Sequence, residues 1–155
     1  LDWVPRSVRS RAREVERAFS ELEHNLGRSP TDDELSTHLR ISADELTRWL
    51  ASIAATTVGP LDRAVAAGYE PESIDSDGME SPVAALEDRE MRDIMRGEIR
   101  KLPERQKLVL SLYYDEGLTL PATGEVLGVT ESRVSQIHTK SVLHLRARMS
   151  AAGVG

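Results

Sequence analysis

The side chains best suited to specific chemistry lie between Thr130 and Met149, and their chemistry is hydrogen bonding. At 100° per residue, the aliphatic residues Val134, Ile137 and Leu145 share one side of a helix drawn through this stretch. The opposite side carries hydroxyl and amide groups, which donate and accept hydrogen bonds and suit the base edges of the DNA major groove. We predict contacts to DNA from that side and its two charged flanks: Glu131, Ser132, Ser135, Gln136, Thr139 and Lys140.

The basic residues of the same stretch suit a different task. Lys and Arg hold phosphates, which fixes the register of a protein on DNA without reading its sequence. We assign phosphate contacts to Arg133, Lys140, Arg146 and Arg148. The alternative is a helix that packs onto another protein, and Leu143, which we expect to be exposed, would fit such a contact.

A second basic row lies at the start of the chain. Arg6, Arg9 and Arg13 recur every three or four residues, which places them on one helical face beside an apolar stripe. We predict nucleic-acid contacts from these three arginines. The alternative is a solvated charged face, partly neutralised by acids such as Glu14.

Metal and catalytic chemistry find little support in the sequence. Glu21 and His24 have a Glu-x-x-His spacing, but the corresponding metal site needs a second copy and the sequence has none, so a surface pair is the preferred interpretation. The sequence contains no glycine-rich phosphate loop, nucleophile elbow or His-Glu-x-x-His motif. We predict a protein that is not an enzyme and has no cofactor or metal of its own.

The first third of the chain predicts three helices. Apolar residues at spacings of three and four mark the first helix, and Gly27 suits its C-terminal end. Ser29 or Thr31 can cap the second, and Ser42 with Glu45 forms a capping box for the third. The predicted helices cover residues 7–26, about 31–39 and from 43 to about 54.

The last third predicts two helices around a tight turn. Thr119 and Thr130 can each cap a helix, and Gly128 suits a left-handed turn position. Pro121 is tolerated in a first helical turn because its missing N–H would be unpaired there. This order is the helix-turn-helix layout, whose second helix enters the major groove.

Residues 56–82 separate these parts and lose helical periodicity as Gly, Pro, Ser and Asp accumulate, which predicts a linker. The helical pattern returns at Val83, with Met91, Met95 and Leu108 assigned to the core, and no strand pattern is found. The predicted fold class is all-α, with two small domains: three helices over 1–57, a flexible acidic linker over 58–82, and four helices with a helix-turn-helix over 83–150.

The net charge of −6 is unevenly distributed. Residues 59–90 carry nine acidic and two basic residues, whereas residues 91–155 carry ten basic and seven acidic residues, so a basic surface is available for phosphates. The absence of cysteine excludes disulfides, and no apolar run approaches the roughly 18 residues of a membrane span, so we expect a cytoplasmic protein. The sequence begins in mid-pattern without methionine, as expected for a piece of a longer protein.

Three stretches resemble bacterial sigma factors of the flagellar and sporulation (sigma-28-like) class in the sigma-70 family. Region 3 of that class is similar to LDWVPRSVRSRAREVERAFSELEHNLGRSPTDDELSTHLRIS, and region 4 is similar to LPERQKLVLSLYYDEGLTL and LGVTESRVSQIHTKSVLHLR. The resemblance covers nearly the whole chain and looks greatest to the sporulation sigma factor of actinomycetes. The family usually has Ala-Glu-Ile where this chain has Pro121, Ala122 and Thr123.

The resemblance implies a role for each part. The linker would thread toward the active site of RNA polymerase, and residues 86–116 would bind the flap of its β subunit. The implied partners are RNA polymerase core (β flap and β′) and promoter DNA. Arg6, Arg9 and Arg13 would approach DNA upstream of the −10 element, whereas the −35 element would be read by Glu131, Ser132, Ser135 and Gln136.

Members of this class are commonly restrained by an anti-sigma protein. In the sporulation branch the restraint can involve cyclic di-GMP, which the anti-sigma partner would chiefly hold because this sequence has no phosphate-binding motif. Two other interpretations remain open at this point. One is a stand-alone helix-turn-helix repressor or activator, and the other is an interaction module that sequesters a partner.

Overall fold

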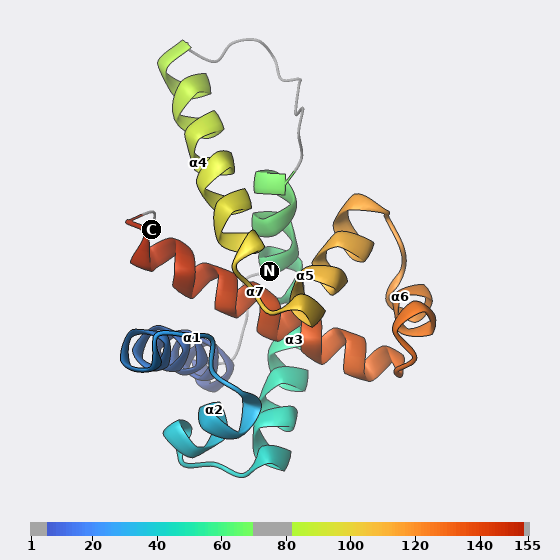
Figure 1. Cartoon of the computed structure of the whole chain (residues 1–155). Helices are drawn as coiled ribbons and strands as arrows, with labels where there is room; N and C mark the ends of the chain where they lie inside the picture. The colour runs from blue at the N-terminus through green and yellow to red at the C-terminus, as the bar shows by residue number, and fades with distance from the viewer. Residues whose placement is uncertain (1–5, 70–81, 154–155) are drawn as a thin grey trace.

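The computed structural model describes residues 6–69 and 82–153, and every regular element in those ranges is helical (Figure 1), which confirms the predicted all-α class. None of the helices in the two ranges is long and apolar enough to cross a membrane. In chain order the elements are α1 (Arg6–Leu26), α2 (Asp32–Leu39), α3 (Ala43–Tyr69), α4 (Pro82–Arg100), α5 (Glu104–Leu110), one π-helical turn η1 (Ser111–Asp115), α6 (Leu120–Leu127) and α7 (Glu131–Ala151).

Local capping explains where the first helices begin and end. Gly27 follows α1 with a φ of 73°, in the left-handed region that favours glycine. Thr31 caps α2, because its hydroxyl accepts the N–H of Glu34 while the Glu34 carboxylate accepts the N–H of Thr31. Ser42 and Glu45 repeat this arrangement at the start of α3. The predicted caps are confirmed, and the threonine is the one of the two candidates that caps α2.

The third helix is longer than the sequence pattern predicts. We expected it to end near Ala54 and a linker to cover 58–82, but α3 continues to Tyr69. The helix runs through Gly59 and Pro60, although both residues disfavour a helix interior. The rest of the predicted linker, residues 70–81, lies outside the described residues.

The helix-turn-helix forms at the predicted place. The Thr119 hydroxyl accepts the N–H of Ala122 at the start of α6, and the Thr130 hydroxyl accepts the N–H of Arg133 at the start of α7. Thr123, which replaces an apolar family residue, is fully buried, and its hydroxyl donates to the Thr119 carbonyl at 2.8 Å. The buried hydroxyl is therefore satisfied, and the departure from the family pattern does not disturb the motif.

α7 lies at the centre of the molecule and contacts helices from both ends of the chain, α1 and α3 as well as α4, α5 and α6 (Figure 1). One hydrophobic core contains Phe19 of α1, Ile53 of α3, Ile99 of α4 and Leu143 of α7. The two predicted helical units thus share a core. The expectation that Leu143 is exposed is wrong, because the N-terminal helices pack against the second half of α7.

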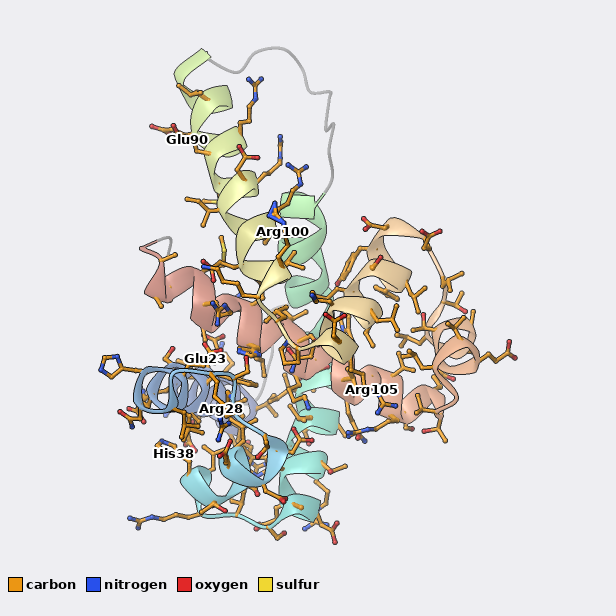
Figure 2. All side chains as sticks on the ribbon, viewed as in Figure 1. Glu23, Arg28, His38, Glu90, Arg100 and Arg105 are labelled. Carbon is orange, nitrogen blue, oxygen red and sulfur yellow. The ribbon has the colours of Figure 1, made fainter. Side chains whose placement is uncertain are left out.

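The first turns of α4 extend beyond this shared core (Figure 1). Met95 is buried as expected, but Met91 is 48% exposed, so its assignment to the core is wrong. Leu108 of α5 was also assigned to the core and is 43% exposed. Glu90, near the middle of α4, and Arg100, at its end, are both exposed (Figure 2). Helical spacing identified the apolar residues of α4 and α5 but could not show how far the neighbouring helices reach.

Candidate nucleic-acid interface

The first half of α7 carries most of the predicted DNA-reading residues at the surface. Val134 and Ile137 are buried and form a small core with Val109 of α5, against which Leu120 and Leu127 pack. The aliphatic side of the helix therefore faces inward, as predicted. On the other side, two predicted contact residues are exposed and three are half-buried: Glu131 and Ser132, then Arg133, Ser135 and Gln136.

A tight turn sets the angle between α6 and α7. Gly128 has a φ of 74°, and the N–H groups of Gly128 and Val129 both donate to the carbonyl of Gly124. A side chain would not fit at Gly124, because a Cβ there would lie 2.6 Å from the carbonyl oxygen of Val129. The close approach of these two backbones holds the first turn of α7 in its exposed position.

The second half of α7 is covered by other helices. Thr139 is fully buried, and its Oγ1 has no hydrogen-bond partner, so the expectation that this side chain lies on an open face is wrong. Helices from both ends of the chain pack against α7, and no local pattern signals contacts between elements so far apart in the sequence. In this arrangement DNA could reach the first half of the helix but not Thr139.

The four basic residues of α7 assigned to phosphates are each within ion-pairing distance of an acid. Lys140 Nζ lies 2.6 Å from Asp32 Oδ1, and Arg133 Nη2 lies 3.8 Å from Oδ2 of the same carboxylate. Arg146 pairs with Glu16 of α1 at 2.9 Å, and Arg148 is held in the network described next. The sequence pattern does not indicate these acids, because the Lys140 partner lies 108 residues away along the chain.

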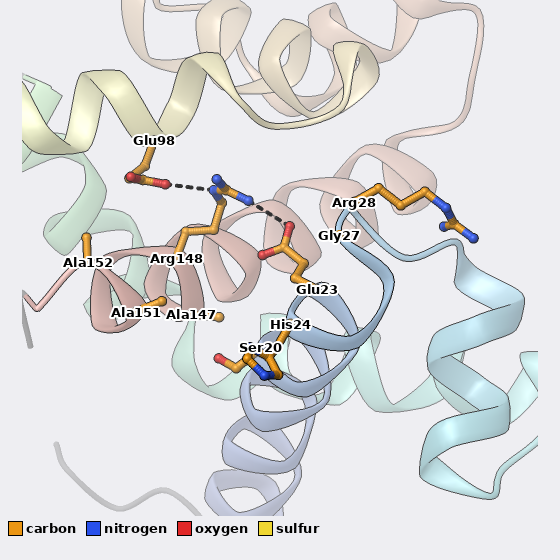
Figure 3. A pocket seen from close by; sticks show the side chains of 10 residues that line it. All are labelled: Ser20, Glu23, His24, Gly27, Arg28, Glu98, Ala147, Arg148, Ala151 and Ala152. Carbon is orange, nitrogen blue, oxygen red and sulfur yellow. Dashed lines mark hydrogen bonds and ion pairs between the residues drawn. The ribbon is translucent and has the colours of Figure 1, made fainter.

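An ionic network joins α1, α4 and α7 (Figure 3). Arg148 donates from Nε to Glu98 and from Nη1 to Glu23, each at 2.8 Å. The fully buried His144 places Nε2 2.8 Å from the same Glu23 oxygen and stacks on Phe19 with a centroid distance of 4.1 Å. Glu23, Glu98 and Arg148 also line a pocket of about 420 Å³. Because Arg148 already pairs with both carboxylates, the three charges serve to hold the helices together.

This network makes stability depend on pH through Glu23. Burial by itself would raise the pKa of the Glu23 carboxyl, but the hydrogen bond and charge of His144 and the charge of Arg148 outweigh burial, so its pKa is lowered. An ionised Glu23 therefore stabilises the fold above the unfolded-state pKa, and this contribution is lost as the pH falls through the folded-state pKa. We expect Glu23→Gln to lower the urea midpoint at neutral pH and to lose this effect in acid, as followed by circular dichroism.

Glu14→Gln is the matched control for the pH experiment. Glu14 lies on the same helix but is exposed, and its hydrogen bond from Ser10 is long at 3.5 Å. The urea midpoint of this variant should follow that of the unaltered chain across the same pH range. If the deficit of Glu23→Gln stays constant from neutral to acid pH, the carboxylate charge is not what stabilises the network.

The arginine row of α1 is open to solvent. Arg6, Arg9 and Arg13 are exposed and make no ion pair with the other described residues. Arg11, on a neighbouring face, lies 5.2 Å over the ring of Trp49, a cation–π contact that fixes α1 against α3. The three arginines are therefore free to meet an anionic partner, which leaves their assignment to DNA as a prediction.

The Glu21 and His24 pair of α1 does not form a metal-binding cluster with the other described residues. Glu21 Oε1 lies 2.8 Å from Nε2 of His38 in α2, an exposed side-chain contact between two helices. Within residues 6–69 and 82–153, no group of three or more His, Cys, Asp or Glu side chains could hold a metal ion.

Two family models match this chain. Sigma-70 region 3 matches residues 10–58, which contain most of α1, all of α2 and the first part of α3. Sigma-70, region 4 matches residues 99–147, which contain α5, α6 and most of α7. The two matches occur in chain order and together span more than half of the chain.

Curated relatives match at similar lengths. The RNA polymerase sigma factor FliA of Escherichia coli (strain K12) is 40% identical over 150 residues, which cover 96% of this chain and 63% of the relative. FliA of Pseudomonas aeruginosa is 38% identical over 151 residues, covering 96% and 61%. The RNA polymerase sigma-D factor of Bacillus subtilis (strain 168) is 28% identical over 149 residues, covering 94% and 59%. The chain spans less than two thirds of the length of these relatives.

One solved structure that matches is described as "Cocrystal structure of the flagellar sigma/anti-sigma complex, Sigma-28/FlgM". The match has a TM-score of 0.50 and 29% identity, and it covers 99% of this chain and 63% of that one. The relatives, both region models and the helix-turn-helix geometry agree. The chain therefore belongs to the sigma-70 family and contains its regions 3 and 4, and it is similar to flagellar sigma-28 proteins.

Proposed function

We propose that the chain gives RNA polymerase its promoter specificity, as the region 3 and region 4 part of an alternative sigma factor. Region 4 reads the −35 element, and region 3 contacts DNA upstream of the −10 element. The observation that carries this proposal is the first half of α7, where polar side chains reach the surface above the buried Val134 and Ile137. The second helix of a helix-turn-helix, presented in this way, places its N-terminal residues on base edges. The chain itself catalyses no step.

The side chains divide by chemistry into two groups. Hydroxyl, amide and carboxylate groups near the start of α7 make base contacts, because they can match the donor and acceptor pattern of each base pair. The basic residues Arg133 and Lys140 hold phosphates, and the α1 row of Arg6, Arg9 and Arg13 holds the DNA backbone upstream of the −10 element. Thr139 joins the interface only when the helices that cover it move. The base contacts come from Glu131, Ser132, Ser135 and Gln136.

Gln136→Ala tests the proposed base contact. In holoenzyme assembled from the longer protein and core polymerase, this change should reduce discrimination between a preferred and a substituted −35 element by about 1–3 kcal/mol, because a bidentate amide contact is lost. Binding to unrelated sequences should change little. The measurement is competition binding on promoter duplexes that differ by one base pair in the −35 element.

Arg133→Ala is the contrasting variant. Loss of a phosphate contact should weaken binding to all sequences alike and reduce the slope of affinity against salt by about one ion. Equal losses of discrimination from the two variants would show that the division into base and phosphate contacts is wrong.

Polymerase binding is assigned to the surface of α4 and α5. Leu86, Met91 and Leu108 are 54%, 48% and 43% exposed, so these two helices offer apolar surface to a protein partner. We assign them to the β flap, and we assign the acidic segment 58–82 to a path toward the active site on β′. A pull-down of core polymerase with the longer protein tests this assignment. The proposed divisions are region 3 over 1–57 and region 4 over 83–150.

Regulation by an anti-sigma protein completes the proposal. It is supported by the similarity to a sigma-28 protein whose solved structure is a complex with FlgM. We further propose, from the resemblance to the actinomycete sporulation branch, a cytoplasmic protein active in sporulation whose anti-sigma partner holds cyclic di-GMP. Calorimetric titration of the purified pair with cyclic di-GMP tests the last point, since the nucleotide should bind the pair and not this chain alone.

A further inference from the structure

Asp32 occupies an unusual position between the two regions. It is the first residue of α2, in region 3, yet its carboxylate contacts Lys140 Nζ at 2.6 Å and Arg133 Nη2 at 3.8 Å, both in region 4. The side chain of Lys140 is only 13% exposed, whereas that of Asp32 is 44% exposed. Arg133 also donates to Gln136, at 3.4 Å. One exposed carboxylate thus holds both cations that flank the base-reading face.

We propose that Asp32 is an internal competitor of promoter DNA. Its carboxylate takes the place of a backbone phosphate between Lys140 and Arg133, and DNA binding exchanges the carboxylate for the phosphate. The inference rests on the proposed function, because it assumes that these two cations meet DNA. It adds an inhibitory contact: as long as Asp32 of α2 stays against α7, the affinity for DNA of any sequence is reduced.

The chemistry of the two anions allows the exchange in both directions. A carboxylate and a phosphate both accept charge-assisted hydrogen bonds from Lys and Arg. The carboxylate is attached to the same chain and needs no partner from solution, so it competes at high effective concentration. DNA offers many phosphates and releases counterions on binding, so it prevails when other contacts bring it close.

The unpartnered Thr139 indicates that the packing of the other helices on α7 is not fully optimised. Its hydroxyl is completely buried next to Lys140 in the sequence and has no hydrogen-bond partner. A buried polar group without a partner destabilises the arrangement that buries it. The arrangement in which Asp32 contacts α7 therefore carries a cost that a rearrangement on DNA binding can remove.

Asp32→Asn, compared with Asp33→Asn, tests the proposal. Both changes remove one negative charge from the first turn of α2, but Asp33 is exposed and makes no ion pair with the other described residues. The probe is a fluorescein-labelled duplex of mixed sequence, bound by the 155-residue chain at low salt and followed by anisotropy. We expect Asp32→Asn to tighten binding roughly 2- to 5-fold, the upper part of the range for a surface ion pair, and Asp33→Asn to tighten it less than about 2-fold.

The Lys140→Ala variant distinguishes a failure of the proposed Asp32 inhibition from a failure of the proposed function. In the Lys140→Ala background, Asp32→Asn should tighten binding less than about 2-fold, because the contact it releases is already gone. Equal effects of Asp32→Asn and Asp33→Asn would overturn the internal competition and leave DNA binding intact. If Lys140→Ala does not weaken binding in the Asp32→Asn background, then α7 does not meet DNA through this residue, and the proposed function fails at that point.

Discussion

Phe19→Ala should lower the free energy of unfolding by about 3–5 kcal/mol, the cost of deleting a buried aromatic side chain. Phe19 is 1% exposed and its ring stacks on His144 at 4.1 Å with an interplanar angle of 10°. The same core holds Leu143 of α7 and Ile53 of α3, so the cavity would open between region 3 and region 4. Urea denaturation followed by circular dichroism measures the change, and one transition should remain because the core is shared.

Leu26→Ala is the control for this core. Leu26 lies on the same helix but is 39% exposed, so its truncation should cost less than about 1 kcal/mol. If Phe19→Ala has an equally small effect in urea, α1 does not pack against α7 in solution. The buried position of Leu143 would then also be wrong.

Gly124→Ala should be the most damaging change within the helix-turn-helix. Alanine usually stabilises a helix relative to glycine, but here the added Cβ would lie 2.6 Å from the Val129 carbonyl oxygen, which is backbone and cannot rotate away. We expect a loss of about 1–3 kcal/mol in stability, the usual cost of overpacking. The angle between α6 and α7 must also change, so promoter discrimination by the holoenzyme should fall together with stability.

Gly97→Ala is the matched control, because the same substitution meets open space. Gly97 lies inside α4, and a Cβ there would have nothing within 4 Å. The replacement should raise stability by about 0.5–1 kcal/mol through helix propensity alone. If Gly124→Ala also stabilises the chain, the close approach of α6 to the turn is not as tight as described.

Local signals in the sequence predicted the helices and the turn of region 4 well. Thr119, Gly128 and Thr130 act through hydrogen bonds and backbone angles within a few residues, and all three cap where predicted. The inward side of α7 was also predictable, because helical spacing places Val134 and Ile137 on one face and both are buried. Interactions of this short range can be predicted from the types of neighbouring residues.

Long-range contacts explain what the sequence pattern could not show. Leu143 and Thr139 were expected at the surface, because helical spacing places them opposite Val134 and Ile137, yet both are buried in the contacts that α7 makes with the other helices. The pairing of Lys140 with Asp32 has the same origin, because nothing near Lys140 in the sequence indicates an acid from α2. The extension of α3 to Tyr69 was not predictable from local signals either, because Gly59 and Pro60 disfavour a helix interior.

The central claim is that the start of α7 lies against the bases of the −35 element. Site-specific photocrosslinking tests it directly, with a photoreactive amino acid in place of Ser132 in the longer protein bound to core polymerase and labelled promoter DNA. Ser132 is exposed at the first turn of α7, whereas Thr37, the control position, is exposed on α2. The account predicts an adduct from position 132 within the −35 element and none there from position 37. Adducts from position 132 that form only with polymerase subunits, or with DNA far from the −35 element, would contradict it.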